Sequence, residues 1–135
     1  MIVIDASALS KYLLREEGWK SVRHFLVKGV RSVGLVLKEV ANAIRKQVHI
    51  FRRIDIDRAQ VLYGQLKRLV EEGIIVIEDE RLYLDKAVEI SFKYGITVYD
   101  SLYLAQASTY GELLTSDEGQ AAIADKLGIK VYHIK

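Results

Sequence analysis

The sequence predicts an α/β protein, a three-layer sandwich in which helices cover both faces of a mostly parallel central sheet of four to five strands. Short apolar runs alternate along the chain with longer segments of helical periodicity, a pattern typical of βαβ units. Ile2–Ile4 and Ile74–Ile77 are aliphatic at every position, as in strands that are buried on both faces. No linker, repeat or low-complexity stretch interrupts the 135 residues. We therefore expect a single domain over residues 1–135.

The composition narrows the class of protein and the kind of metal site. Half of the residues are hydrophobic, which excludes disorder. No apolar run approaches the ~20 residues of a membrane span, and the apolar start lacks a basic leader, so we expect a cytoplasmic protein without a membrane partner. Cysteine is absent, which excludes disulfides, thiolate metal sites and a cysteine nucleophile. The net charge of +2 is too small to indicate nucleic-acid binding by itself.

The first half of the chain contains two strands and four helices in our interpretation. The strand 2–4 stops at Asp5, and helical spacing then runs from about Ser7 to Glu17, where Gly18 ends it. A helix from Trp19 to Gly29, a strand at 30–33 and a helix through 37–48 follow. A long helix then opens at Ile54–Asp57, with Asp55 or Asp57 as its cap, and ends at Gly73.

The second half repeats the alternation. After the strand 74–77 we expect helices at about 81–94 and 118–127, and strands at 112–117 and 130–134. Between them, Ile96–Val98 is interpreted as a short strand that breaks into a helix at Tyr99–Asp100. Glycine and aspartate mark these boundaries because the chain has no proline.

Three aspartates, Asp5, Asp100 and Asp117, follow apolar segments at the start of a helix. The carboxyl ends of parallel strands share one edge of a sheet, and ligands bind beyond that edge. Glu39 lies early in its helix and can face the same edge if the strand before that helix lies beside the first strand. The alternative is that each aspartate is only a helix cap and that Glu39 is a surface residue. Serines within two residues of each aspartate (Ser7, Ser101 and Ser116) can cap instead, which favours a joint acidic site.

A dication would compensate four converging carboxylates. The three histidines lie far apart in the sequence, so any metal would be held by oxygen, which favours Mg²⁺ or Mn²⁺. One or two such ions orient a phosphodiester and generate a nucleophile from water. No histidine or lysine stands out as a general base, so we expect metal-activated water to be the nucleophile.

The segments IVIDASAL, LKEVANAI, VYDSLYLAQA and LLTSDEG, in this order and at these spacings, resemble the PIN-domain nucleases. Within that family they are most similar to small toxin ribonucleases of the VapBC toxin–antitoxin type, the VapC proteins, and the similarity covers nearly the whole chain. The resemblance implies that the catalytic and metal-binding residues are Asp5, Glu39, Asp100 and Asp117, and that supporting residues are Ser7, Asn42 and Thr115. It also implies Mg²⁺- or Mn²⁺-dependent cleavage of single-stranded RNA, a homodimer, and inhibition by a cognate antitoxin protein.

A basic run between residues 45 and 53 is a second functional candidate. Its cations Arg45, Lys46, Arg52 and Arg53 would contact phosphates, with an aromatic side chain stacking on a base. The alternative is a helix end that continues into a solvated loop.

Other functions remain open on the same fold. The first is a non-catalytic RNA- or protein-binding module. A phosphorylated receiver domain is disfavoured because Asp5 has no acidic neighbour, and an Asp-x-Asp phosphatase because Ser7 stands at the second acidic position.

Overall fold

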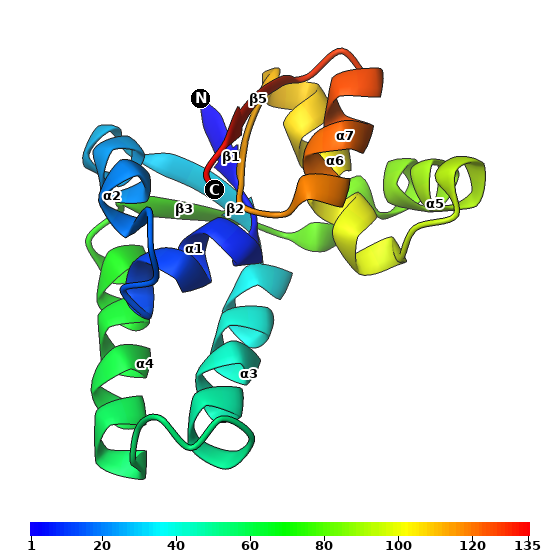
Figure 1. The fold of residues 1–135 in the computed structure, drawn as a ribbon. Coiled ribbons are helices and arrows are strands. Elements are labelled where there is room, and N and C mark those ends of the chain that lie inside the picture. Colours follow the sequence, from blue (N-terminus) through cyan, green and yellow to red (C-terminus); the bar gives the residue numbers. More distant parts are fainter.

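The computed structural model describes residues 1–135 and contains one five-stranded sheet, with strands β1 (Ile2–Ile4), β2 (Val30–Val33), β3 (Ile75–Glu78), β4 (Glu112–Thr115) and β5 (Lys130–His133). The strand order is β3-β2-β1-β4-β5, and every neighbouring pair is parallel. β1 is therefore central, as its uniformly apolar sequence predicts, and Val3 and Ile4 are fully buried. The predicted α/β class is confirmed (Figure 1).

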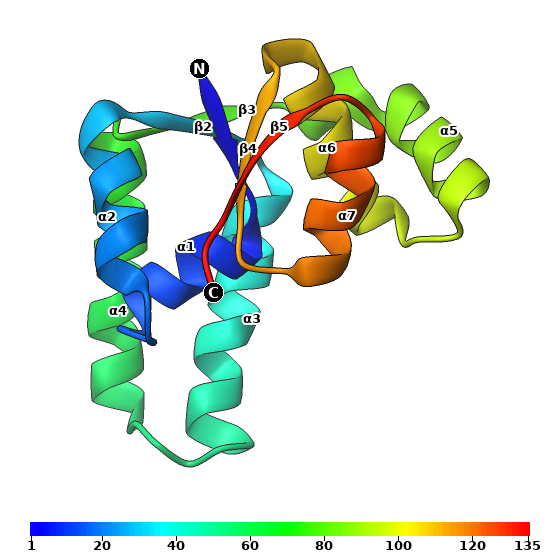
Figure 2. The ribbon, with the colours of Figure 1, turned by 45° about the horizontal axis from the view of Figure 1, so that its top comes forward.

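Seven α-helices flank the sheet: α1 (Ala6–Leu13), α2 (Trp19–Lys28), α3 (Leu35–His49), α4 (Ile56–Glu71), α5 (Leu84–Tyr94), α6 (Val98–Tyr110) and α7 (Glu118–Lys126). A 3₁₀ turn, η1 (Glu80–Tyr83), precedes α5. Figure 1 shows α1 to α4 gathered on one side of the sheet and α5 to α7 on the other. In Figure 2, α3 and α4 project away from the sheet as a helical arm, closed at its far end by the loop between them.

Helix α6 is the most deeply embedded helix. It packs on β1, β2 and β4 and is covered by α5 and α7. Seven consecutive residues, 101–107, are buried, so this helix is buried around its whole circumference instead of along one stripe. A helix enclosed in this way holds its first turn in a fixed place beside the sheet.

The first helix is shorter than predicted, since α1 ends at Leu13 and not near Glu17. The reason is a Schellman-type reversal, in which Glu16 N donates to Lys11 O at 3.0 Å. Arg15 occupies the left-handed position of this turn, with φ of 54°. Glycine usually marks that position, and because arginine stands there the sequence gives no stop signal.

The segment Ile96–Val98 is not a strand, which corrects the interpretation of Asp100 as a residue after a strand. Gly95, in the left-handed region with φ of 70°, ends α5, and α6 begins only three residues later. Thr97 is the cap, because its side chain accepts from Asp100 N at 3.1 Å. Asp100 consequently lies inside the first turn of α6. Elsewhere Asp55 caps α4, and no helix combines the length and the apolar character that crossing a membrane requires.

Candidate active site

Asp5 lies between the central strand and α1 and is 3% exposed. Its Oδ1 accepts hydrogen bonds from Ala8 N at 3.1 Å and from Ser7 Oγ at 2.6 Å. Its Oδ2 accepts from Thr115 Oγ1, at the end of the neighbouring strand β4, at 2.5 Å. The residue therefore caps α1 and at the same time faces the carboxyl edge of the sheet. Capping and membership of a site are not alternatives at this position.

The environment of Asp5 perturbs its ionisation. Burial raises the pKa of its carboxyl from 3.8 to about 6, against the opposing effect of the hydrogen bonds from Ser7, Thr115 and Ala8. The charge of Asp117 raises this pKa further, which places the Asp117 carboxylate near that of Asp5. At neutral pH Asp5 is mostly ionised, as a buried anion that a nearby cation would stabilise.

Asp117 caps α7 and lies in the loop that follows β4. Its Oδ1 accepts from Gln120 N at 2.7 Å, and its own N–H donates to Thr115 Oγ1 at 3.1 Å. The same loop is tied to the start of α1, because Ser116 N donates to Ser7 Oγ at 2.8 Å. This hydrogen-bond network fixes the first and last predicted acids relative to each other.

Asp100 is joined to this group from α6. The side chain of Gln120 donates to Asp100 O at 2.9 Å, so the cap of α7 and the first turn of α6 are held together. Asp100 is exposed as a residue, but the protein around its carboxyl raises the pKa by desolvation, and Asp117 raises it further. The charge of Asp117 therefore raises the pKa of both other aspartates.

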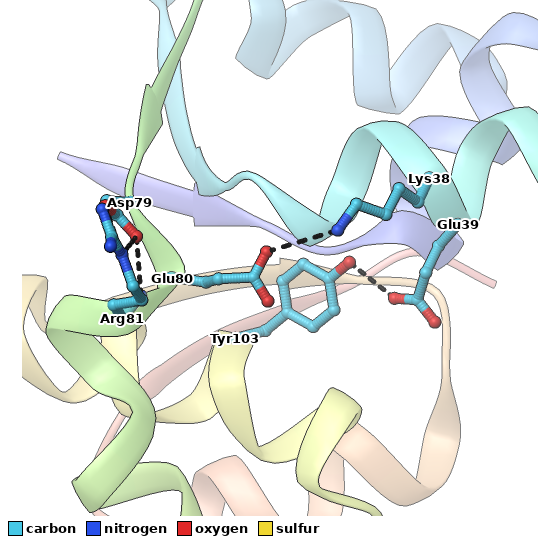
Figure 3. Close-up of polar contacts among 6 residues, drawn as sticks. All are labelled: Lys38, Glu39, Asp79, Glu80, Arg81 and Tyr103. Atoms are coloured by element: carbon cyan, nitrogen blue, oxygen red, sulfur yellow. Dashed lines mark hydrogen bonds and ion pairs between the residues drawn. The ribbon is translucent and has the colours of Figure 1, made fainter.

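Glu39 lies on α3 and is half-buried. Its Oε1 accepts a hydrogen bond of 2.6 Å from the hydroxyl of Tyr103, which lies one turn after Asp100 on α6 (Figure 3). The pKa of Tyr103 is raised by burial first, then by its bond to Glu39 and by the charges of Glu39, Asp5 and Asp100. Three of the four predicted acids thus surround one phenol.

This set of side chains fits a hard divalent cation in its chemistry, because every candidate ligand is a carboxylate oxygen. No three Asp, Glu or His side chains lie close enough together in the structure to coordinate an ion. Mg²⁺ commonly binds through only one or two carboxylates and keeps several waters, so it does not require a closed protein cage. Burial is the main cause of the raised pKa values of Asp5 and Asp100, and the charge of Asp117, which no cation offsets, raises both further.

The other predicted residues divide into two groups. Ser7 and Thr115 lie beside Asp5, and their hydroxyl oxygens are 3.2 Å apart. Asn42 lies one turn after Glu39 on α3, but it is exposed, and its Oδ1 accepts from Arg45 Nε at 2.8 Å. Asn42 therefore supports a surface arginine in this structure and makes no hydrogen bond to an acid.

The predicted RNA-binding cations are distributed along the helical arm. Arg45 and Lys46 lie about two turns beyond Glu39 on α3. Arg52 and Arg53 follow in the loop at the far end of the arm (Figure 2), where Arg52 has φ of 52° and the Arg53 guanidinium lies 5.0 Å from the ring centre of Phe51. All four are exposed, and the structure does not bring the loop arginines to the acidic edge.

Two residues at the site were not singled out from the sequence. Gln120 is 5% exposed and links Asp100 to Asp117. Its signal was the spacing of a capping box, with Asp117 at the cap and a glutamine three residues later. The other residue is Tyr103, for which helical spacing from Asp100 was the only available sign that it faces the acids.

The parallel sheet and its acidic edge place the chain in the class of α/β domains with a nuclease-type fold. The chain belongs to the PIN family, since the model of the PIN domain matches residues 2–126. PIN domains are generally nucleases that use divalent metal ions, and the family predicted from the four sequence motifs is thereby confirmed. A comparison with curated proteins finds no match to this chain.

Proposed function

We propose that this protein is a metal-dependent endoribonuclease that cleaves single-stranded RNA. The observation that carries the proposal is the buried, ionised Asp5 at the end of the central strand, next to Asp117 and in the electrostatic field that also includes Asp100 and Glu39. A role as a helix cap alone does not account for the charge of Asp117 next to this buried carboxylate. The similarity of the four motifs to small toxin ribonucleases supports RNA over DNA as the substrate.

The residues take distinct parts in this proposal. Asp5 has the deepest carboxylate, so it is the central ligand, and Glu39 and Asp100 approach it from the two helix layers. Asp117 lies beside both aspartates and would complete the binding of one ion or help to hold a second. Bound Mg²⁺ or Mn²⁺ would offset these charges, polarise the phosphate and lower the pKa of a water molecule at the scissile bond.

The hydroxyls of Ser7 and Thr115 act on Asp5 and not on the substrate. Each donates to one of its carboxylate oxygens, which counters the effect of burial on the pKa. They keep the central ligand ionised and in one rotamer. Metal ligands have to be deprotonated to bind, so this contribution is largest at and below about pH 6, the pKa of Asp5, and fades at higher pH.

The experiment compares wild type with Asp5→Asn on a labelled single-stranded RNA and on DNA of the same sequence, with Mn²⁺, with Mg²⁺ and with EDTA. We expect metal-dependent cleavage of the RNA that Asp5→Asn abolishes. Asp55→Asn is the matched control, because Asp55 makes the same kind of cap bond, from Arg58 N at 2.8 Å, at an exposed helix start. RNA binding that survives EDTA, without cleavage under any metal, would show the non-catalytic module instead. Cleavage by the Asp5→Asn protein would point to a contaminating nuclease and refute the assignment.

We further propose that the chain is the toxin of a VapBC-type toxin–antitoxin pair and forms a homodimer. The support is the order and spacing of the four motifs over a chain of 135 residues. Induced expression should arrest bacterial growth, and expression of the Asp5→Asn variant should not. Growth that continues with an active ribonuclease would separate the enzyme from the toxin role. Light scattering of the purified chain tests the dimer, and a cognate antitoxin would be recognised by restored growth on co-expression.

A further inference from the structure

Tyr103 forms the only side-chain hydrogen bond that links the two helix layers at the acidic edge. It lies on α6 and is 1% exposed, and its hydroxyl donates to Glu39 Oε1 on α3 at 2.6 Å. Buried tyrosine hydroxyls generally need a polar partner. Here that partner is a proposed metal ligand contributed by a residue 64 positions away in the chain.

The neighbours of Glu39 leave it no other partner. Lys38, the adjacent residue on α3, is directed toward η1, where its Nζ lies 4.0 Å from Glu80 Oε1 (Figure 3). Arg81, further along η1, is bound by Asp79 at 2.6 Å. These two cations are therefore engaged away from Glu39. The phenol of Tyr103 alone orients the Glu39 carboxylate.

We propose that Tyr103 is a positioning residue for Glu39. The hydroxyl of Tyr103 donates to Glu39 Oε1 and leaves Glu39 Oε2 to bind the divalent cation. This inference rests on the proposed function. Tyr103 also lies one turn after Asp100 on the same helix, α6, so the two residues keep a fixed position relative to each other. One rigid helix thus contributes one ligand directly and aligns a second ligand on α3.

The structure contains a matched control for this bond. Tyr83 is 8% exposed, and its hydroxyl donates to Glu78 Oε1 at 2.6 Å. Glu78 also accepts from Gln106 and Tyr110 and lies 3.5 Å from Arg31, so it belongs to a separate polar cluster. Tyr83→Phe and Tyr103→Phe therefore remove the same kind of bond, of the same length, and only Tyr103→Phe removes it from the acidic edge.

The test measures Mn²⁺ binding by isothermal titration calorimetry for wild type, Tyr103→Phe, Tyr83→Phe, Glu39→Gln and the double variant Glu39→Gln/Tyr103→Phe. Residues that orient metal ligands typically change metal affinity by 10- to 100-fold, so we expect Tyr103→Phe to weaken binding by about 10-fold or more. Tyr83→Phe should stay within about twofold of wild type. Tyr103→Phe should add little weakening to Glu39→Gln, because contacting residues are coupled. Thermal melting should remain cooperative in both tyrosine variants.

The outcomes separate this inference from the proposed function. If wild type binds Mn²⁺ and Tyr103→Phe binds it equally well, the positioning role is overturned and the nuclease proposal stands. If Tyr103→Phe weakens binding in the Glu39→Gln background as much as in wild type, Tyr103 does not act through Glu39, and the inference is again wrong. If wild type neither binds Mn²⁺ nor cleaves RNA, the proposed function fails, and the positioning role fails with it.

Discussion

Replacing Asp5 with asparagine is expected to stabilise the metal-free protein at neutral pH, although Asp5 makes three hydrogen bonds. Burial and the charge of Asp117 raise the pKa of Asp5 from 3.8 to about 6, so its ionised form is disfavoured in the folded state. Asparagine caps helices about as well as aspartate. Its oxygen can accept from Ser7 and Ala8, and its amide can donate to Thr115 Oγ1. The substitution therefore removes a buried charge and keeps most of these bonds: the Thr115 hydroxyl can donate to Ser7 Oγ, 3.2 Å away, while one N–H of the new amide is left without a partner.

The magnitude follows from the two pKa values. A separation of about two pH units, at about 1.4 kcal/mol for each, corresponds to ~3 kcal/mol of destabilisation by the ionised carboxylate. Because asparagine replaces charge-assisted hydrogen bonds by weaker ones, the net gain should be about 1–3 kcal/mol. The sign depends on pH. Below about pH 4 Asp5 is protonated in both states and no penalty exists, and the penalty grows as pH rises toward about 6 and is complete above it.

Urea unfolding in EDTA at several pH values between 4 and 8 measures this directly. At pH 7.5 the midpoint for Asp5→Asn should exceed that of wild type by about 0.5–1.5 M, from a slope of about 2 kcal/mol/M. The difference should shrink as pH falls and disappear near pH 4. Asp55→Asn, at the exposed cap of α4, should change the midpoint little at any pH. A wild type that is as stable as Asp5→Asn at pH 7.5, or a difference that does not depend on pH, would refute the reasoning.

Three further predictions concern the same edge and the helical arm. Mn²⁺ at ~100 times its dissociation constant should stabilise wild type by about 2.7 kcal/mol, and a melting temperature that does not respond to a metal titration would contradict an ion site. Thr115→Val removes a buried hydroxyl that donates to Asp5 and accepts from Asp117 N, so urea unfolding should show a loss of about 1–3 kcal/mol, whereas Thr109→Val, at an exposed position, should show little. Replacing both Arg45 and Lys46 with glutamine should reduce the salt dependence of RNA binding by about 1.4 in logarithmic slope if both contact phosphates, and an unchanged slope would exclude them from the interface.

The sheet was predictable because its signal is local. The aliphatic runs around Val3 and Val76 locate β1 and β3 without knowledge of the rest of the chain. Burial on both faces, expected for both runs, is confirmed for β1 and wrong for β3, which is an edge strand with Val76 37% exposed. The polar residues that follow the apolar runs of β1 and β4 identified Asp5 and Asp117. The order β3-β2-β1-β4-β5 depends on which strands pair, and the apolar character of a single strand does not determine its partners.

The errors arose where backbone geometry is set by a residue of unexpected type or by a distant contact. Arg15 adopts a left-handed conformation that is usually marked by glycine, so the end of α1 was placed too late. Ile96–Val98 is apolar because Ile96 and Val98 pack against the core from the turn between two helices, and apolar character alone does not distinguish that turn from a short strand. The bond between Tyr103 and Glu39 joins residues on different helices, and a single sequence contains no signal for such a pair.

In three of the four acids, one group makes a structural hydrogen bond and another group makes none. Asp117 Oδ1 accepts from Gln120 N, and Glu39 Oε1 accepts from Tyr103, so one oxygen of each carboxylate is fixed while the other is left for a ligand. Asp100 is anchored through its backbone, by Thr97 and Gln120, and its carboxylate is left without a hydrogen bond. Asp5 uses both oxygens, but each carboxylate oxygen has more than one acceptor site. These hydrogen bonds therefore orient the anions, so that the observed capping role of Asp5 and Asp117 is compatible with the ligand role proposed for them.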